Sequence, residues 1–192
     1  LGHLQAVGTA AQPIIFTSLA NNGPNQWAGL LFDGGTGELR HATVRYAGDP
    51  NGVTRSNITA QNVTAGEVRI ESSQVRNVAS WNTWESDYGL YVLNSRVVVS
   101  DTLFANNGND SGADWPVYIP AGDLHRVQLS GNSFSGNANN RVLVAGGSLS
   151  ADAVLTPQTG LVGYELSSDL TVPAGITFTP EPGVTVMGRD GT

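Results

Sequence analysis

Most of the side chains that could do chemistry in this chain are aromatic or acidic, and they cluster at residues 81–88. The group comprises Trp81, Trp84, Glu85, Asp87, Tyr88 and, further along the chain, Trp115. Aromatic faces can stack on sugar rings while carboxylates hold the hydroxyls, and the same mixture is typical of protein–protein contacts. Structural packing of each ring against the core is the third interpretation. The group therefore predicts a binding ridge for a glycan or a protein, with packing as the alternative.

The carboxylates of these loops also raise the question of hydrolysis. A glycosidase needs two carboxyl groups that flank the scissile bond, one of them with a raised pKa. Glu85 and Asp87 would have to meet each other, or Asp110 or Asp114, across loops that are distant in the sequence. Acidic loop residues are usually just solvated. We therefore expect no catalytic residues and favour a protein without enzymatic activity.

Oxygen donors are concentrated around a glycine turn at residues 110–114. Asp110 and Asp114 flank Gly112 in this turn, and Ca²⁺ takes carboxylate oxygens as ligands. The turn lacks the full ligand spacing of the EF-hand loop. The sequence thus indicates Asp110 and Asp114 as the candidate calcium ligands, and it predicts no other cofactor.

A recurrent strand-turn-strand cassette must position these residues. Its first strand begins at Leu30, Ile58, Leu90, Val117 and Val142, with spacings of 28, 32, 27 and 25 residues. Short β-branched segments and turns follow each start, and no amphipathic helix intervenes. A period of this size indicates a solenoid, in which each unit packs against its neighbours. We predict an all-β protein in which residues 1–192 form one continuous parallel β-helix.

Two kinds of connection separate the predicted strands. Asn-rich segments such as Gln74–Asn77 and Thr102–Asn107 end successive coils, and stacked Asn side chains can hydrogen-bond between coils and tolerate left-handed backbone. We interpret them as structural corners. Longer loops interrupt the cassette at residues 20–26, 48–57, 79–88 and 108–115. Because these loops precede successive coils at one phase, we expect them to stack into a single exposed ridge.

Charge and composition limit the classes of partner that the chain is suited to bind. The 192 residues carry a net charge of −7, with nine arginines and neither lysine nor cysteine. A chain without a basic stripe is poorly suited to nucleic acid or to anionic membrane surfaces, and no apolar run approaches the ~20 residues of a membrane span. The weakly charged surface, rich in Thr, Ser and Asn, favours an extracellular or cell-surface location.

Several segments resemble right-handed parallel β-helix proteins of the bacterial extracellular type. Val99–Gly108 and Gln128–Asn137 are similar to their coil repeat, in which an apolar-x-apolar strand leads into Phe and Asn. Gln26–Phe32 is similar to the Trp-x-Gly-apolar-x-Phe motif of such modules. The resemblance covers most of the chain and implies a right-handed β-helix. The family includes lyases, glycosidases, adhesins and passive stalks, so it does not specify an activity.

The lyases of this family use a calcium site and a basic residue that removes a proton. Only arginine is available for that role here, because lysine is absent. The arginines lie mainly in strand or corner segments, near Glu38, Glu71 and Asp101. This placement predicts ion-pair ladders on the surface rather than a catalytic base.

The sequence at the C-terminal end is of a kind that is normally continued by a segment like the N-terminal end. In related modules a piece like Pro182–Val186 runs on into a segment like Leu4–Thr9, which stands here at the start of the chain. Solitary solenoids carry atypical terminal units that block open strand edges, and neither end shows such a unit. We expect a period of a tandem array or copies that stack head to tail. Ends trimmed at convenient places are the alternative.

The leading hypothesis is a non-enzymatic, structural or adhesive β-solenoid of the cell surface. Its expected partners are further copies or flanking repeats, and glycans or other surface proteins. The alternative is a module that binds or cleaves polysaccharides through Trp81, Trp84, Glu85 and Asp87.

Overall fold

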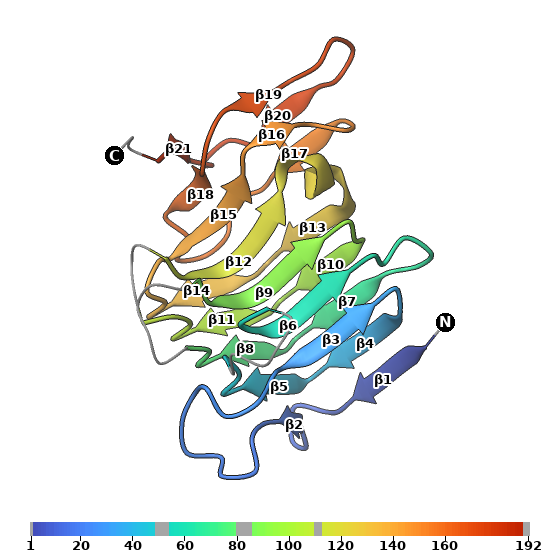
Figure 1. Cartoon of the computed structure of the whole chain (residues 1–192), viewed down its shortest axis with the longest axis vertical. Coiled ribbons are helices and arrows are strands. Elements are labelled where there is room, and N and C mark those ends of the chain that lie inside the picture. The colour runs from blue at the N-terminus through green and yellow to red at the C-terminus, as the bar shows by residue number, and fades with distance from the viewer. Residues whose placement is uncertain (1, 49–53, 80–85, 110–112, 190–192) are drawn as a thin grey trace.

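The chain winds as a parallel β-solenoid, as the sequence predicts, in a computed structural model that describes residues 2–48, 54–79, 86–109 and 113–189 (Figure 1). Three parallel sheets form its sides. Sheet 1 contains β1 (His3–Val7), β4 (Thr36–Arg40), β7 (Val68–Glu71), β10 (Val97–Ser100) and β13 (Val127–Ser130). Sheet 2 contains β2 (Ile14–Phe16), β5 (Ala42–Arg45), β8 (Gln74–Arg76), β11 (Leu103–Ala105) and β14 (Ser133–Ser135). Sheet 3 contains β3 (Leu30–Asp33), β6 (Ser56–Gln61), β9 (Tyr88–Leu93), β12 (Trp115–Pro120), β15 (Arg141–Ala145), β18 (Gly163–Leu166) and β21 (Val186–Gly188).

The strand register confirms the period of the cassette. Leu30, Ile58, Leu90, Val117 and Val142, the five predicted starts, are consecutive register partners in sheet 3. Residues about thirty positions apart in the sequence therefore lie one above the other. All pairings between the described strands of the sheets are parallel, since each strand pairs with the equivalent strand of the next coil.

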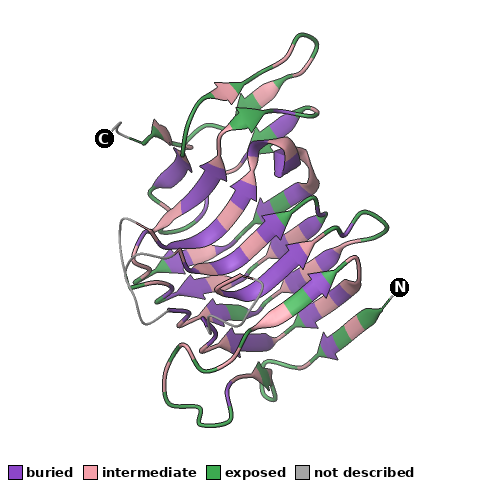
Figure 2. Ribbon diagram, viewed as in Figure 1, coloured by how far each residue is buried: buried purple, intermediate pink, exposed green. Residues whose placement is uncertain are grey.

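Alternating side chains of each strand fill the interior of the solenoid. In sheet 1 the register partners Leu39, Ile70, Val99 and Leu129 form one inward row, and each is at most 7% exposed. Sheet 2 adds stacked rings from consecutive coils, Phe104 and Phe134, whose centroids lie 5.1 Å apart. Figure 2 shows the buried residues running along the strands of the middle coils. Such stacking buries the apolar face of each coil against the next one.

Left-handed residues turn the chain at the corners. At the corner between sheets 1 and 2 the equivalent residues are His41, Ser72, Asp101 and Gly131, with φ between 47° and 63°. At the corner after sheet 2 the equivalent residues are Tyr46, Asn77, Asn106 and Gly136, with φ between 53° and 68°. This backbone costs about 1–2 kcal/mol for residues other than glycine, so the rest of the corner must offset it. The Asn-rich segments are structural corners, as the sequence indicates.

A ladder of buried hydrogen bonds follows the left-handed residue at the first corner. The N–H of Ala42 donates to Ser73 Oγ (3.0 Å), and the N–H of Ser73 donates to Thr102 Oγ1 (3.3 Å). The N–H of Thr102 then donates to Asn132 Oδ1 (3.0 Å), and the N–H of Asn132 donates to Gln158 Oε1 (2.9 Å). Each buried corner amide is therefore satisfied by a side chain of the next coil, which avoids the penalty of an unpaired buried donor.

A second ladder runs along the corner after sheet 2. The N–H of Val78 donates to Asn107 Oδ1 (3.4 Å), and that of Asn107 donates to Asn137 Oδ1 (3.0 Å). Asn107 Nδ2 also donates to the carbonyl of Val75 at 2.9 Å. Asn107 is fully buried, so its amide holds the corner of its own coil to the coils on both sides.

A fourth side appears in the later coils. The six-residue 3-10 helix η1 (Ala121–Arg126) follows β12, and the same place in the next coils holds β16 (Gly147–Ser148) and β19 (Leu170–Thr171). The strands β17 (Ala153–Leu155) and β20 (Phe178–Pro180) pair with each other, not with β13. No described helix has the length and hydropathy of a membrane span. Sheet 1 therefore ends at β13, and a separate two-stranded sheet continues this side.

Replacement of Asn132 by alanine tests the first ladder. The variant leaves the buried N–H of Thr102 without its acceptor, so we expect a loss of about 1–3 kcal/mol in the free energy of unfolding in urea. The exposed Gln128 on the neighbouring strand serves as the control, and Gln128→Ala should change stability by less than about 0.5 kcal/mol. Equal effects of the two substitutions would contradict the role of the ladder.

Candidate functional site

The long loops all lie at one corner of the solenoid, as expected. They connect a strand of sheet 2 to a strand of sheet 3, from β2 to β3, from β5 to β6, from β8 to β9 and from β11 to β12. Trp81, Trp84, Glu85 and Asp110 lie outside the described residues. The predictions that rest on these four side chains therefore stay predictions. Asp87, Tyr88, Asp114 and Trp115 are described and lie at the start of β9 and β12.

Three tyrosines form a cluster on sheet 3, next to this corner. Tyr91 and Tyr118 are register partners, and their rings stack with centroids 4.6 Å apart and planes 1° apart. Tyr88 lies 5.4 Å from Tyr91 and 5.2 Å from Tyr118, with its ring tilted by 55° to both. All three rings are partly exposed. The tyrosine cluster, Tyr88, Tyr91 and Tyr118, is therefore an aromatic surface built by two successive coils.

Burial raises the pKa of the phenols of Tyr88 and Tyr118. Burial, together with the neighbouring phenols of Tyr91 and Tyr88, raises the pKa of Tyr118 to about 12. Burial also raises the pKa of Tyr88, and the nearby Tyr91, Asp114 and Asp87 add to that increase. Neutral phenols offer hydroxyl donors and acceptors beside apolar ring faces. These are the properties that suit stacking on a sugar ring or on another aromatic group.

Two tryptophans at the same corner support the fold from within. Trp115 is only 2% exposed and stacks on Tyr88 at 6.4 Å, and its indole N–H donates to Glu165 Oε2 at 3.3 Å. The indole N–H of Trp27 donates to the carbonyl of Arg45 at 2.8 Å while its ring packs against the core. The rings of Trp27 and Trp115 thus cover the coil edge. Trp115 contributes to the tyrosine cluster by supporting Tyr88.

Glu165 forms a buried charged group next to Trp115. It is 4% exposed, and it pairs with Arg141 Nη1 at 3.1 Å and with Arg189 Nε at 3.9 Å. The guanidinium of Arg189 also lies 5.3 Å from the centroid of the Trp115 ring. A buried carboxylate held by two guanidinium groups satisfies the rule that buried charges are paired. We interpret this group as a structural clamp across sheet 3.

Asp87 and Asp114 are completely buried and shape the loop ends. The side chain of Asp114 accepts the N–H of Asp87 at Oδ1 (2.9 Å) and the N–H of Asn109 at Oδ2 (2.7 Å). Gly108 allows this approach, because a Cβ there would come within 2.3 Å of Asp114 Cβ. Both oxygens of Asp114 therefore fix the backbone at this corner.

The described residues contain no group of three or more His, Cys, Asp or Glu side chains with the arrangement of a metal site. Asp114 is one of the two predicted calcium ligands, and Asp110, the other, is not described. The calcium prediction is thus untested. In the described part, the chemistry of Asp114 is hydrogen bonding to backbone amides.

Arginine and glutamate form an ion-pair ladder on sheet 1, as expected for Glu38 and Glu71. Arg40 Nη2 lies 2.8 Å from Glu38, and Arg40 Nε lies 3.2 Å from Glu71 of the next coil. Arg69 pairs with Glu67 and, at 3.0 Å, with Glu71. The hydrogen bond from Arg69 is the main cause that lowers the pKa of Glu71. These arginines are bound to carboxylates on both sides, which fits a structural ladder.

Comparison of the chain with protein-family models, curated proteins and solved structures found no match to any of them. The parallel solenoid is established by the strand register. The resemblance to bacterial surface β-helices rests on the sequence motifs alone.

Tyr91 and Tyr118 are the site residues that the sequence interpretation missed. They lie inside strands, where single aromatic residues are ordinary. Only the register of β9 and β12 makes them neighbours, since the two residues are 27 positions apart. An alignment of the successive coils would have placed both tyrosines at the same position of the repeat.

The charged ladder makes stability depend on pH in acid. Because Arg69 lowers the pKa of Glu71 in the folded state, the ion pair is complete above the ordinary carboxyl pKa of about 4.3 and is lost as pH falls through the lowered value. Glu71→Gln should therefore reduce the loss of stability below about pH 4.3 by at most about 1 kcal/mol, since the group is partly exposed. Urea unfolding at several pH values measures the effect. The exposed Glu181, changed to Gln, is the control; an equal change in that control would contradict the assignment.

Proposed function

We propose that this chain is a structural segment of an extracellular β-solenoid that is extended by further coils at its ends. Such coils come from a second copy or from flanking repeats. The observation that carries the proposal is that both ends present open strand edges and half-buried interior side chains among the described residues.

Among the described residues, open strand edges are found at both ends of the solenoid. At the N-terminal end, β1, β2 and β3 are the edge strands of sheets 1, 2 and 3. At the C-terminal end, β19, β20 and β21 are the edge strands of their sheets. Unpaired edges are templates for a further strand, and monomeric proteins usually protect them.

Interior side chains at the two ends lack the full cover that the middle coils give each other. The first coil leaves Leu4, Ile14, Phe16 and Leu30 only partly buried against the core. The last coil does the same with Leu170, Ile176, Phe178, Val184 and Val186. The register partners of Phe16 and Leu30 in the next coil, Val44 and Ile58, are at most 1% exposed. A stacked coil would bury this apolar surface, which favours association.

The order in which the strands of the three sheets follow along the chain also permits a further coil. The first described strand belongs to sheet 1 and the last to sheet 3, and in the early coils a strand of sheet 3 is followed by one of sheet 1. A following coil that begins like β1 therefore continues the winding in phase. The two ends differ in shape, because only the C-terminal end has the fourth side formed by β16 and β19. A head-to-tail contact continues the parallel pairing of the sheets, and such a contact extends without closing.

Scattering and mass measurements over a concentration series test this proposal. We expect the apparent mass to rise with concentration, because the open ends stack. Phe16→Glu and Phe178→Glu place a charge on the N-terminal and C-terminal faces, and each should keep the protein monomeric. Leu19→Glu is the control, because this loop leucine is fully exposed. Uniformly monomeric wild-type protein at all concentrations would contradict stacking between copies and leave flanking repeats as the only source of further coils.

A second candidate function is glycan binding at the tyrosine cluster. The stacked pair Tyr91 and Tyr118 favours it, because a flat and neutral aromatic face suits a sugar ring. The loop residues Trp81, Trp84, Glu85 and Asp87 remain the sequence-based part of this candidate. Adhesion to a surface polysaccharide would then be combined with the structural role.

A glycan array followed by titration calorimetry tests the second candidate. Tyr118→Ala should weaken binding of any glycan found by about tenfold, which corresponds to about 1.4 kcal/mol. Trp84→Ala and Glu85→Ala, measured with a reducing-sugar assay, test the sequence-based part. Tyr46→Ala is the matched control, because Tyr46 follows β5, one coil before β9, and its ring lies beside the guanidinium of Arg45. Absence of any glycan signal would leave the structural role alone.

A further inference from the structure

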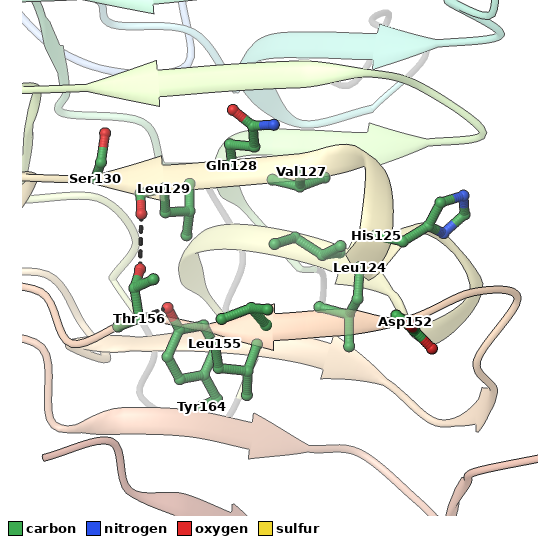
Figure 3. A pocket seen from close by; sticks show the side chains of 12 residues that line it. Leu124, His125, Val127, Gln128, Leu129, Ser130, Asp152, Leu155, Thr156 and Tyr164 are labelled. Carbon is green, nitrogen blue, oxygen red and sulfur yellow. Dashed lines mark hydrogen bonds between the residues drawn. The ribbon is translucent and has the colours of Figure 1, made fainter. Parts of the chain in front are cut away.

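A crevice opens in the wall of the solenoid where sheet 1 ends. It lies between β13 and β17 and has a volume of about 370 Å³ (Figure 3). The described sheets pair β13 only with β10, and β17 only with β20. The change from three sides to four, caused by η1, thus separates two strands that would otherwise have been neighbours.

Backbone groups of both strands face this crevice. On β13, the carbonyl of Ser130 accepts the N–H of Asp101 in the coil below, so the alternate residues Val127 and Leu129 are oriented to the crevice. The N–H of Val127 donates to the carbonyl of Leu124, so Val127 offers its carbonyl alone. On β17, Ala153 and Leu155 bond to the coil above through Thr177 and Glu181. Val154 must therefore turn its N–H and carbonyl toward β13. A donor and an acceptor are available on each wall.

One end of the crevice is closed and the other is open. At the closed end, Thr156 Oγ1 donates to the carbonyl of Leu129 at 2.7 Å, and Gln158 Nε2 donates to the same carbonyl at 3.0 Å. This bridge holds the strands too close for a full extra strand, which would need twice the usual spacing of about 4.8 Å. The open end carries His125 and Asp152 (Figure 3). The width at the bridge therefore favours a narrow ligand over a peptide strand.

The floor of the crevice is apolar. Leu124 and Leu155 lie between the strands (Figure 3), and Ile119, Leu129 and Tyr164 complete the floor. These five side chains are at most 7% exposed. At the lip, Val154 is 51% exposed. The volume falls within the range of pockets that bind small molecules, which are mostly apolar with a few placed polar groups.

We propose that this crevice binds a small amphipathic molecule. An aromatic ring or short alkyl chain lies against Leu124 and Leu155. An amide-like head donates to the carbonyl of Val127 and accepts the N–H of Leu129, as a neighbouring strand would, and Val154 offers the same two groups on the opposite wall.

His125 lies at the open end of the crevice. Its Nε2 accepts from Arg126 Nε at 3.2 Å, so the neutral ring carries its proton on Nδ1. This Nδ1 is buried and has no hydrogen-bond partner among the described residues.

Methyl-resolved NMR titration with benzamide and with toluene tests the proposal. Benzamide has both the ring and the head, whereas toluene has only the ring. We expect saturable shifts of the Leu124, Leu129 and Leu155 methyl groups with benzamide, and none for the fully buried Leu39. Benzamide should bind about fivefold more tightly than toluene, which is the effect of about one net hydrogen bond.

A cavity-filling variant provides the second measurement. Leu124→Phe places extra volume in the crevice, so the ring of benzamide can no longer be buried there. Benzamide binding should fall at least tenfold, because the ligand loses the free energy of burying its apolar surface. Val162→Phe, at an exposed position outside the crevice, should leave binding unchanged. If Leu124→Phe fails to fold, the methyl titration of the wild-type protein decides alone. Shifts that are absent or spread over the core, or toluene binding as tightly as benzamide, would overturn the proposal.

Discussion

The hydrogen bond between a buried corner amide and a side chain of the next coil is the interaction on which this solenoid depends. A chain that turns through a left-handed residue directs the following N–H inward, where water cannot reach it. Ser73, Thr102, Asn132 and Gln158 accept these amides in succession. Because each acceptor belongs to the coil above, the bond both satisfies the corner and fixes the position of the next coil.

This fixed superposition explains where the surface features arise. Side chains in equivalent positions of successive strands become neighbours, which brings Tyr91 onto Tyr118 and Arg40 onto Glu71. The crevice arises where the strands of successive coils are no longer superposed. Once η1 adds a side to the coil, β17 no longer follows β13 in register, and the exposed edges of two strands remain. The wall is thus continuous in the early coils and interrupted near the C-terminal end.

The coil architecture could be predicted from the sequence because its causes are local and repeated. Apolar strand starts recur at a near-constant period, and two of them, Ile58 and Leu90, are indeed register partners. The fourth side could not be predicted in this way, since Ala121–Arg126 has the composition of an ordinary turn. Nor could the tyrosine cluster, which depends on the exact register between β9 and β12. The proposed loop residues Trp81 and Trp84 lie in insertions without a repeat to fix them.

Disulfide cross-linking tests the superposition of the coils most directly, because the natural chain has no cysteine. Val98 and Gln128 are outward register partners on adjacent coils, whereas Arg69 lies one coil further away. Adjacent coils are about 4.8 Å apart, within reach of a disulfide, and two coils are about 9.6 Å apart, beyond it. Coils stacked in this register should give rapid oxidation of the Val98→Cys, Gln128→Cys pair and none of the Arg69→Cys, Gln128→Cys pair. The reverse result, or equal cross-linking of both pairs, would contradict it.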